Sequence, residues 1–283
     1  MSVAERMVET SHGKVAVSES SGKGPATLLV HGNSSSKAVF AGQLASPLGE
    51  AHRLIAIDLL GNGASDNAID PARTYSLPGL ADAAIETLKA MGIERASVFG
   101  WSLGGHVAME MIVRFPGLVG LMVSGAPPIS PTLESIQAGF KPNPLVMLIG
   151  KQDFTAEEVA GFGQGTYGAL FDDRFRKTIE RADGRMRRMT FENLMAGIPA
   201  DEKRAAQEAS MPIAFVNGAE DPFVNLDYVA GLRCRNLWED HCFVLRGLGH
   251  VPFLQEPKTF NPIFGRFLDD MAKRASLPKS VAA

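Results

Sequence analysis

The sequence is poor in cysteine, with only Cys234 and Cys242 among its 283 residues. Two cysteines cannot build a disulfide framework, and these two do not form the Cys-x-x-Cys pattern of redox and zinc sites. We therefore expect two free structural thiols. The six histidines follow no metal-ligand spacing, and the dense His/Asp motif of zinc enzymes is missing. The sequence thus predicts neither a metal nor another cofactor.

Long apolar runs and a strong charge of either sign are also missing. No stretch approaches the roughly 18 apolar residues of a membrane span, and residues 1–6 lack the apolar core of a signal peptide. The formal net charge of -3 gives no overall attraction to nucleic acid or to an anionic membrane. We expect a cytoplasmic monomer or homodimer that binds a small molecule and neither nucleic acid nor membrane.

The rest of the chain alternates short apolar runs with stretches of helical spacing. Helical spacing is clearest in residues 77–91 and 103–115. Such alternation predicts crossover units and a mostly parallel, twisted sheet that is covered by helices on both faces. The runs that we interpret as buried strands are 27–31, 54–58, 96–100, 120–124, 213–217 and 242–245.

This alternation stops near Pro128 and resumes near Met211. The block between them, residues 130–208, is rich in Phe, Met, Gly and Arg. We expect it to form a helical lid at the carboxyl ends of the strands, where ligands bind in open α/β sheets. Residues 1–129 and 209–283 then form the core, and residues 276–283 are expected to be a frayed tail.

Gly100-Trp101-Ser102-Leu103-Gly104 is a G-x-S-x-G motif between a predicted strand and a predicted helix. In α/β-hydrolases this motif places a nucleophilic serine on a sharp, strained turn, where only small residues fit beside it. We predict Ser102 as the nucleophile of such a fold, with the helical lid inserted after the sixth strand. The alternative is a helix N-cap between tightly packed glycines.

The loop that follows the first buried run supplies the second element of an ester-cleaving site. His31-Gly32-Asn33 stands where this architecture lends a backbone N–H to an oxyanion hole. We predict the N–H groups of Asn33 and Leu103 as its donors. The alternative for the loop is a plain turn. The adjacent residues 34–37 are interpreted as a capped helix start.

Two further loops complete a triad in the chain order Ser, acid, His. We predict Asp221 as the acid, with its neighbour Glu220 as the rival. His250 is the predicted general base, and His106, one helical turn beyond Ser102, is expected to serve in packing or support.

Two patterns in the lid receive structural interpretations. Residues 163–168 fit G-x-G-x-x-G, but no strand precedes them, so we interpret them as a flexible loop and not as a dinucleotide site. The basic residues between 174 and 188 are interleaved with acidic ones. They predict a solvated helix with ion pairs, and an anion-binding or lid-docking role is the alternative.

The combination of residues 31–36, 100–106, 183–188 and 216–224 resembles the bacterial α/β-hydrolase-fold N-acyl homoserine lactonases, which use no metal. The resemblance covers nearly the whole chain, and the stretch 183–188 is its more particular part. It implies Ser102, His250 and Asp221 as the triad, with Asp221 at a position where relatives have Glu. It also implies that Phe162 replaces a lid tyrosine that holds the substrate, with Tyr167 as the nearby substitute.

The predicted function is hydrolysis of the ring ester of N-acyl homoserine lactones through an acyl-enzyme on Ser102. The alternatives are a general carboxylesterase for small esters and, more remotely, a small-molecule receptor on a hydrolase scaffold. Residues predicted to bind the ester or lactone substrate are Gly32, Trp101, Phe140, Phe162, Tyr167, Met186, Phe191 and Val251.

Overall fold

The computed structural model describes residues 2–276, and an eight-stranded sheet lies at its centre. The strands are ordered β1-β2-β4-β3-β5-β6-β7-β8. Neighbouring strands from β4 through β3 to β8 are parallel. In contrast, β1 pairs with β2, and β2 with β4, in antiparallel fashion. The strand bounds are β1 Ala4–Thr10, β2 Gly13–Glu19, β3 Ala26–Val30, β4 Arg53–Ile57, β5 Ala96–Trp101, β6 Leu118–Ser124, β7 Ile213–Gly218 and β8 Phe243–Leu245.

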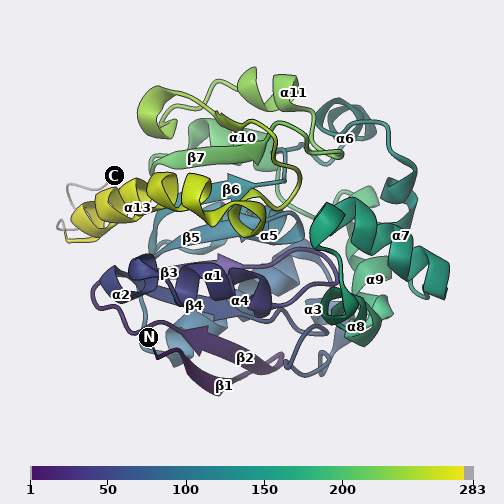
Figure 1. Ribbon diagram of the computed structural model, residues 1–283, viewed down its shortest axis with the longest axis horizontal. Helices are drawn as coiled ribbons and strands as arrows, with labels where there is room; N and C mark the ends of the chain where they lie inside the picture. The colour runs from purple at the N-terminus through teal and green to yellow at the C-terminus, as the bar shows by residue number, and fades with distance from the viewer. Residues whose placement is uncertain (1, 277–283) are drawn as a thin grey trace.

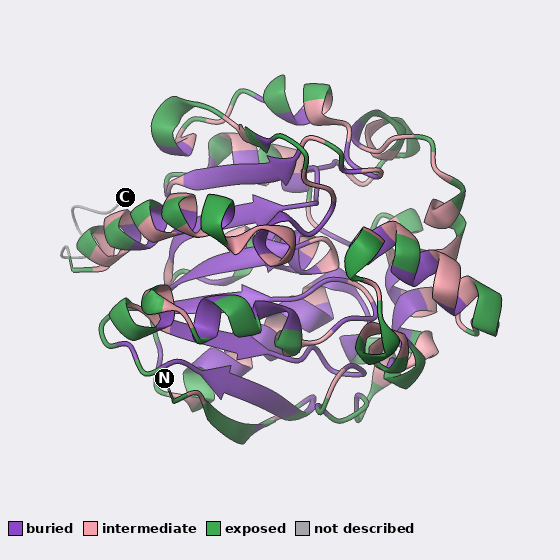
Figure 2. Ribbon diagram, viewed as in Figure 1, coloured by how far each residue is buried: buried purple, intermediate pink, exposed green. Residues whose placement is uncertain are grey.

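Helices cover both faces of the sheet, which confirms the predicted mostly parallel α/β architecture. One face carries α1, α2 and α13, and the other carries α4, α5 and α10 (Figure 1). The central strands are buried between these layers (Figure 2). The bounds are α1 Ala41–Leu44, α2 Pro47–Ala51, α3 Pro71–Thr74, α4 Leu77–Ala90, α5 Leu103–Arg114, α10 Glu202–Glu208, α11 Leu226–Ala230, α12 Pro252–Gln255 and α13 Pro257–Ala275.

All six predicted strands are present, but the N-terminal hairpin β1–β2 was missed. In β1 only Val8 is buried, so the strand lacks the apolar run that marks the others. Charged residues such as Glu5 and Arg6 occupy its exposed positions, as is common in edge strands. The predicted frayed tail lies outside the described residues, except for Ser276.

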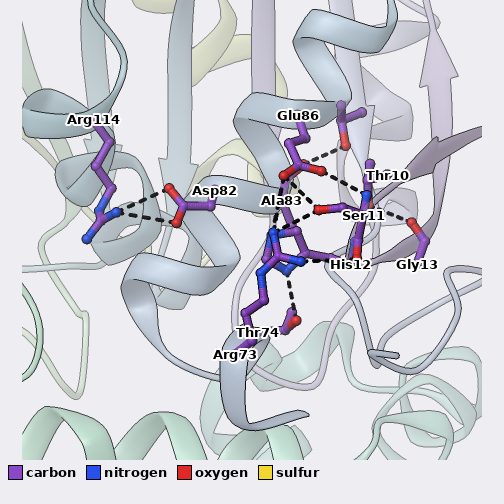
Figure 3. Close-up of polar contacts among 11 residues, drawn as sticks. Thr10, Ser11, His12, Gly13, Arg73, Thr74, Asp82, Ala83, Glu86 and Arg114 are labelled. Carbon is purple, nitrogen blue, oxygen red and sulfur yellow. Dashed lines mark hydrogen bonds and ion pairs between the residues drawn. The ribbon is translucent and has the colours of Figure 1, made fainter. Parts of the chain in front are cut away.

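Polar contacts attach this hairpin to the helices beside it (Figure 3). The backbone N–H and hydroxyl of Ser11, in the β1–β2 turn, each donate a 2.8 Å hydrogen bond to the Glu86 carboxylate of α4. Arg73 of α3 donates to the Ser11 hydroxyl at 2.8 Å. The buried His12 ring shares a 2.8 Å hydrogen bond with the Thr74 hydroxyl. The exposed edge strand is thus held by hydrogen bonds and not by a large apolar face.

Between β6 and β7 the chain forms the inserted helices α6 to α9, followed by α10. The inserted helices α7, α8 and α9 gather at one end of the sheet (Figure 1). Within residues 2–276, none of the helices has the length and apolar character that a membrane crossing needs. The bounds of the inserted helices are α6 Leu133–Gly139, α7 Ala156–Tyr167, α8 Asp173–Arg181 and α9 Gly184–Met195.

The prediction of a flexible loop at residues 163–168 was wrong, because most of this stretch belongs to helix α7. Its glycines allow neighbouring side chains to approach the helix closely. A Cβ at Gly163 would lie 2.0 Å from the ring of Phe171, and one at Gly165 would lie 2.1 Å from Leu145. The glycines therefore serve packing.

The basic stretch behaves largely as predicted. Arg174, Arg185 and Arg188 form ion pairs with acidic neighbours, and all three side chains are substantially exposed. Arg187 is the exception, because its side chain is buried. Its contacts are with backbone carbonyls and a hydroxyl and not with a carboxylate.

Candidate active site

Ser102 lies on the turn between β5 and α5 in a strained backbone conformation. Its φ of 54° and ψ of -123° are values that residues other than glycine rarely adopt. The turn is tight, since a Cβ at Gly100 would lie 2.3 Å from the carbonyl oxygen of Gly104. The Ser102 side chain forms no capping hydrogen bond with the helix. Ser102 thus occupies the N-cap position of α5, but its side chain does not cap the helix.

His250 and Asp221 form a buried pair beside this turn. Nδ1 of His250 lies 2.8 Å from Oδ2 of Asp221. The other carboxylate oxygen accepts hydrogen bonds from the backbone N–H groups of Phe223 and Val224, at 2.8 and 3.1 Å. Burial raises the pKa of Asp221, but His250 and these donors outweigh it and hold the pKa below its usual value. The rival Glu220 is exposed to solvent.

Aromatic rings hold His250 in place. The imidazole packs against Trp101, with ring centroids 5.6 Å apart, and against Phe223 at 4.8 Å. His250 and Ser102 line the same cavity. Among residues 2–276 the Ser102 hydroxyl has no hydrogen-bond partner. In apo enzymes the serine–histidine contact is often loose and tightens around substrate.

The loop after β3 approaches Ser102 closely. A Cβ at Gly32 would lie 3.0 Å from Cβ of Ser102. Within the described part of the chain, the backbone N–H groups of Asn33 and Leu103 have no acceptor. Both donors are thus available for a ligand, and both residues line the cavity.

The capped helix start predicted for residues 34–37 needs correction. A short 3₁₀ helix does begin at Lys37, but the Ser36 side chain makes no capping hydrogen bond. The backbone N–H of Lys37 instead donates to Oδ1 of Asp58 at 2.6 Å. A carboxylate from the end of β4 therefore replaces the serine cap.

The cavity beside Ser102 has a volume of about 590 Å³ and is lined mainly by apolar side chains. Most of the lining comes from the inserted helices and the segments that connect them. Five residues from the predicted substrate-binding set line it: Trp101, Phe140, Phe162, Met186 and Phe191.

The other three residues of that set do not line the cavity. Tyr167 is buried, its hydroxyl donates to Ser35 Oγ at 2.9 Å, and its ring stacks on Phe175 with centroids 4.0 Å apart. Tyr167 therefore cannot substitute for a hydroxyl at Phe162. Val251 is fully buried within the core. Gly32 contributes its backbone to the turn beside Ser102.

The cavity also contains polar residues that the sequence analysis did not assign to it. His106 lines it, and His106 Nδ1 lies 2.8 Å from the buried Glu202 carboxylate of α10. Burial raises the pKa of Glu202, although His106 opposes that effect. Thr166 and Thr190 line the cavity as well. The helical spacing of Thr166 from Phe162 could have indicated its position.

The chain matches the Alpha/beta hydrolase family over residues 27–263. It belongs to that family. A solved structure of the N-acyl homoserine lactonase AidH with N-butanoyl homoserine is 43% identical, with a TM-score of 0.92 and coverage of 95% of this chain and 97% of that one. A serine-to-glycine variant of AidH with N-hexanoyl homoserine lactone is 42% identical, with a TM-score of 0.92 and coverage of 95% and 99%.

A curated relative of this hydrolase is less similar. The pimeloyl-[acyl-carrier protein] methyl ester esterase of Nitrosomonas europaea is 27% identical over 87% of this chain and 96% of its own length. Together with the lactonase structures, this relative places the chain among the hydrolases of carboxylic esters. The resemblance to the lactonases is confirmed.

Proposed function

We propose that this hydrolase opens the ring ester of N-acyl homoserine lactones through an acyl-enzyme on Ser102. The observation that carries the proposal is the buried Asp221–His250 pair, which lies with Ser102 beside a mainly apolar cavity of about 590 Å³. Apolar pockets of this size suit small ligands with acyl chains. The proposed catalytic residues are Ser102, His250 and Asp221, and the proposed oxyanion donors are the N–H groups of Asn33 and Leu103.

In the first half of the reaction, His250 takes the Ser102 proton while Oγ attacks the lactone carbonyl carbon. The oxyanion accepts hydrogen bonds from Asn33 and Leu103. When the ring C–O bond breaks, the imidazolium gives its proton to the departing oxygen, which becomes the homoserine hydroxyl. Asp221 keeps the proton on Nδ1 and stabilises the imidazolium.

In the second half, His250 takes a proton from water, and the resulting hydroxide attacks the ester on Ser102. The Ser102 oxygen recovers a proton from His250 as the acyl group leaves. One lactone and one water thereby give one N-acyl homoserine, and the enzyme returns to its starting state.

The choice of substrate is supported by the ligands of the similar lactonase. The structure without the serine substitution holds N-butanoyl homoserine, a ring-opened acid, whereas the serine-to-glycine variant holds an intact lactone. This contrast is expected of a serine that opens the ring. The amide of such a substrate would lie near the cavity's polar side chains, which include His106 and Thr190.

A general carboxylesterase for small esters is the second candidate. Phe162 favours it, because the resemblance implies a substrate-holding tyrosine where this chain has no hydroxyl. Sites that hydrogen-bond their substrates discriminate far more strongly than apolar pockets do. The methyl ester esterase relative also favours this candidate.

The test is acid release, followed by pH-stat, from N-butanoyl and N-hexanoyl homoserine lactone beside p-nitrophenyl acetate. We expect chelator-insensitive turnover of both lactones that disappears in Ser102→Ala. Ser210→Ala, which alters an exposed serine, should match the wild type. Cleavage of the nitrophenyl ester alone would contradict the lactonase proposal and favour the carboxylesterase.

The proposal includes the arrangement of the chain. Residues 130–208 would form a lid over a core of residues 1–129 and 209–283, so that lid side chains surround the acyl chain. Since every proposed catalytic residue comes from one chain, the cytoplasmic enzyme would act as a monomer or as a homodimer of independent sites.

A further inference from the structure

Arg187 is a buried cation without an ion pair among the described residues. Its side chain is 4% exposed, and the guanidinium lies 4.1 Å from the ring centroid of Phe154. Nε donates to the carbonyl of Lys151 at 2.9 Å, and Nη2 donates to that of Gln152 at 2.6 Å. Burial lowers the pKa of Arg187 to about 10, so the group stays charged at neutral pH. Burying such a charge is costly, so its contacts call for an explanation.

The third nitrogen of Arg187 connects it to the loop beside Ser102. Nη1 donates to Ser34 Oγ at 2.8 Å, and this hydroxyl donates to Asn33 Oδ1 at 3.0 Å. At its other end, the Asn33 amide donates to the carbonyl of Ile149 at 3.0 Å. Both ends of the Asn33 side chain are therefore held by contacts that lead to the segment between β6 and β7.

Ser34, which connects Arg187 to Asn33, has a strained backbone. Ser34 has a φ of 51° and is fully buried. A residue other than glycine keeps such a conformation only where its surroundings enforce it. The hydrogen bond from Arg187 is one such constraint, and it acts on the residue that directly follows Asn33.

Helix α9 is itself anchored to the core, which makes it a firm support for Arg187. The backbone N–H of Asp183 donates to the Gly61 carbonyl at 2.7 Å, and the Tyr75 hydroxyl donates to Asp183 Oδ2 at 2.7 Å. At Gly184 a Cβ would lie 1.9 Å from the Gln152 carbonyl oxygen, so only glycine fits there. The stretch 183–188 thus brings α9, the segment 151–152 and the loop 33–34 together.

We propose that Arg187 is a positioning residue for the oxyanion hole, and that it fixes the Asn33 peptide through Ser34. This inference rests on the proposed function, in which the Asn33 N–H stabilises the oxyanion. Arg187 lines the same cavity as Ser102, but in this proposal it acts through Ser34 and Asn33 and not on the reacting atoms. Its loss should slow the reaction because a displacement of the Asn33 N–H by about 1 Å can reduce the rate roughly 10²-fold.

The test compares Arg187→Lys with Arg188→Gln, its neighbour on α9, whose side chain is 41% exposed. Lysine keeps the charge but cannot donate to three separated acceptors. For Arg187→Lys we expect kcat on N-hexanoyl homoserine lactone to fall about 10²-fold with little change in KM. Arg188→Gln should behave as the wild type.

Two inhibitors separate positioning from a general loss of structure. Hexylboronic acid forms a tetrahedral anion on a serine and requires the oxyanion hole, whereas N-hexanoyl cyclopentylamine has the substrate's shape without its ester. In Arg187→Lys the inhibition constant of the boronic acid should rise by the same factor by which kcat falls, while that of the amide stays constant. Equal weakening of both inhibitors, or an unchanged kcat, would overturn the proposal.

A second variant tests the proposal if Arg187→Lys misfolds. Ser34→Gly accepts the positive φ and removes the side chain that carries the bridging hydroxyl. It should lower kcat and weaken the boronic acid without weakening the amide. The kcat of the double variant should be no lower than that of Ser34→Gly alone, because both changes break the same series of hydrogen bonds. Additive losses in kcat would show that Arg187 does not act through Ser34.

The proposed function and this inference fail in different ways. If the wild type leaves lactones intact but cleaves p-nitrophenyl acetate, the lactonase proposal falls. The same variants and the boronic acid still test Arg187 on the nitrophenyl ester, since ester cleavage of any kind here uses the oxyanion hole.

Discussion

The indole N–H of Trp101 donates a 2.8 Å hydrogen bond to the backbone carbonyl of His250. The residue before the candidate nucleophile therefore holds the loop of the candidate base. Asp221 holds the same histidine from the other side, through Nδ1. With the backbone of His250 held by Trp101 and its ring held by Asp221, small changes in either partner should alter catalysis more than they alter folding.

Asp221→Asn should reduce kcat on ester or lactone substrates by about three to four orders of magnitude. An amide can hold His250 in place, but it favours the wrong tautomer and cannot stabilise the imidazolium. Steady-state kinetics, with circular dichroism to check folding, would measure the effect. Glu220→Gln alters the exposed neighbour and should leave kcat near the wild-type value. If Glu220→Gln had the larger effect, the acid would be misassigned.

Gly163→Ala should lower the free energy of unfolding by about 1–3 kcal/mol, since its new methyl group would overlap the Phe171 ring. Gly161→Ala, on the same helix, is the matched control. A Cβ there meets only Leu145, at 3.9 Å, and alanine should stabilise the helix by about 0.5–1 kcal/mol. Thermal or urea unfolding would measure both. If both variants changed the free energy of unfolding by the same amount in the same direction, the packing explanation for Gly163 would be refuted.

Asp183→Asn should lower the free energy of unfolding by about 2 kcal/mol at pH 7, because it removes the charge that Arg185 and Tyr75 bind. Asparagine still caps α9. Burial raises the pKa of Asp183, but its donors outweigh burial and the pKa lies below the ordinary value. A carboxyl with a lowered pKa stabilises the fold fully above its unfolded pKa of about 3.9 and loses that contribution as pH falls through its folded pKa.

The difference in stability between wild type and Asp183→Asn should therefore be constant from pH 7 to about 5 and shrink below about 4. Urea unfolding across this range would measure it. Asp173→Asn, which alters a side chain that is 91% exposed, provides the control and should change stability little. If the difference in stability between the two proteins grew as the pH fell, Asp183 would not have a lowered pKa in the folded protein.

The sequence predicted the parts of the site that depend on local backbone. A G-x-S-x-G turn needs its glycines because the chain passes close to itself, so the motif locates Ser102 wherever a strand precedes it and a helix follows. The buried strands were equally visible, since each is a continuous apolar run. The edge strand β1 was invisible to that criterion, because hydrogen bonds to α3 and α4 hold its turn in place.

Contacts between distant segments were harder to predict. Nothing near Tyr167 in the sequence indicates that its hydroxyl bonds Ser35, far away in the chain. Arg187 likewise stood among charged neighbours and was grouped with them. Its burial results from the carbonyls of Lys151 and Gln152 together with Ser34, which only the folded chain brings together.

Phe162→Tyr should raise kcat/KM for N-hexanoyl homoserine lactone about tenfold and leave that for p-nitrophenyl acetate unchanged. Phe162 lines the cavity, and the resemblance to the lactonases implies a substrate-holding tyrosine at this position. One net hydrogen bond to the substrate contributes up to about 1.5 kcal/mol, which corresponds to roughly tenfold. The small nitrophenyl ester lacks the acylamide that such a hydroxyl would bind.

The matched control is Phe154→Tyr. The ring centroid of Phe154 is 5.5 Å from that of Phe162, yet Phe154 does not line the cavity. A hydroxyl there should leave the ratio of lactonase to esterase activity constant. If Phe162→Tyr raised both activities equally, the new hydroxyl would be acting on the shared catalytic residues. If it lowered lactone turnover alone, an apolar wall at Phe162 would itself be the feature that suits this enzyme's acyl chain.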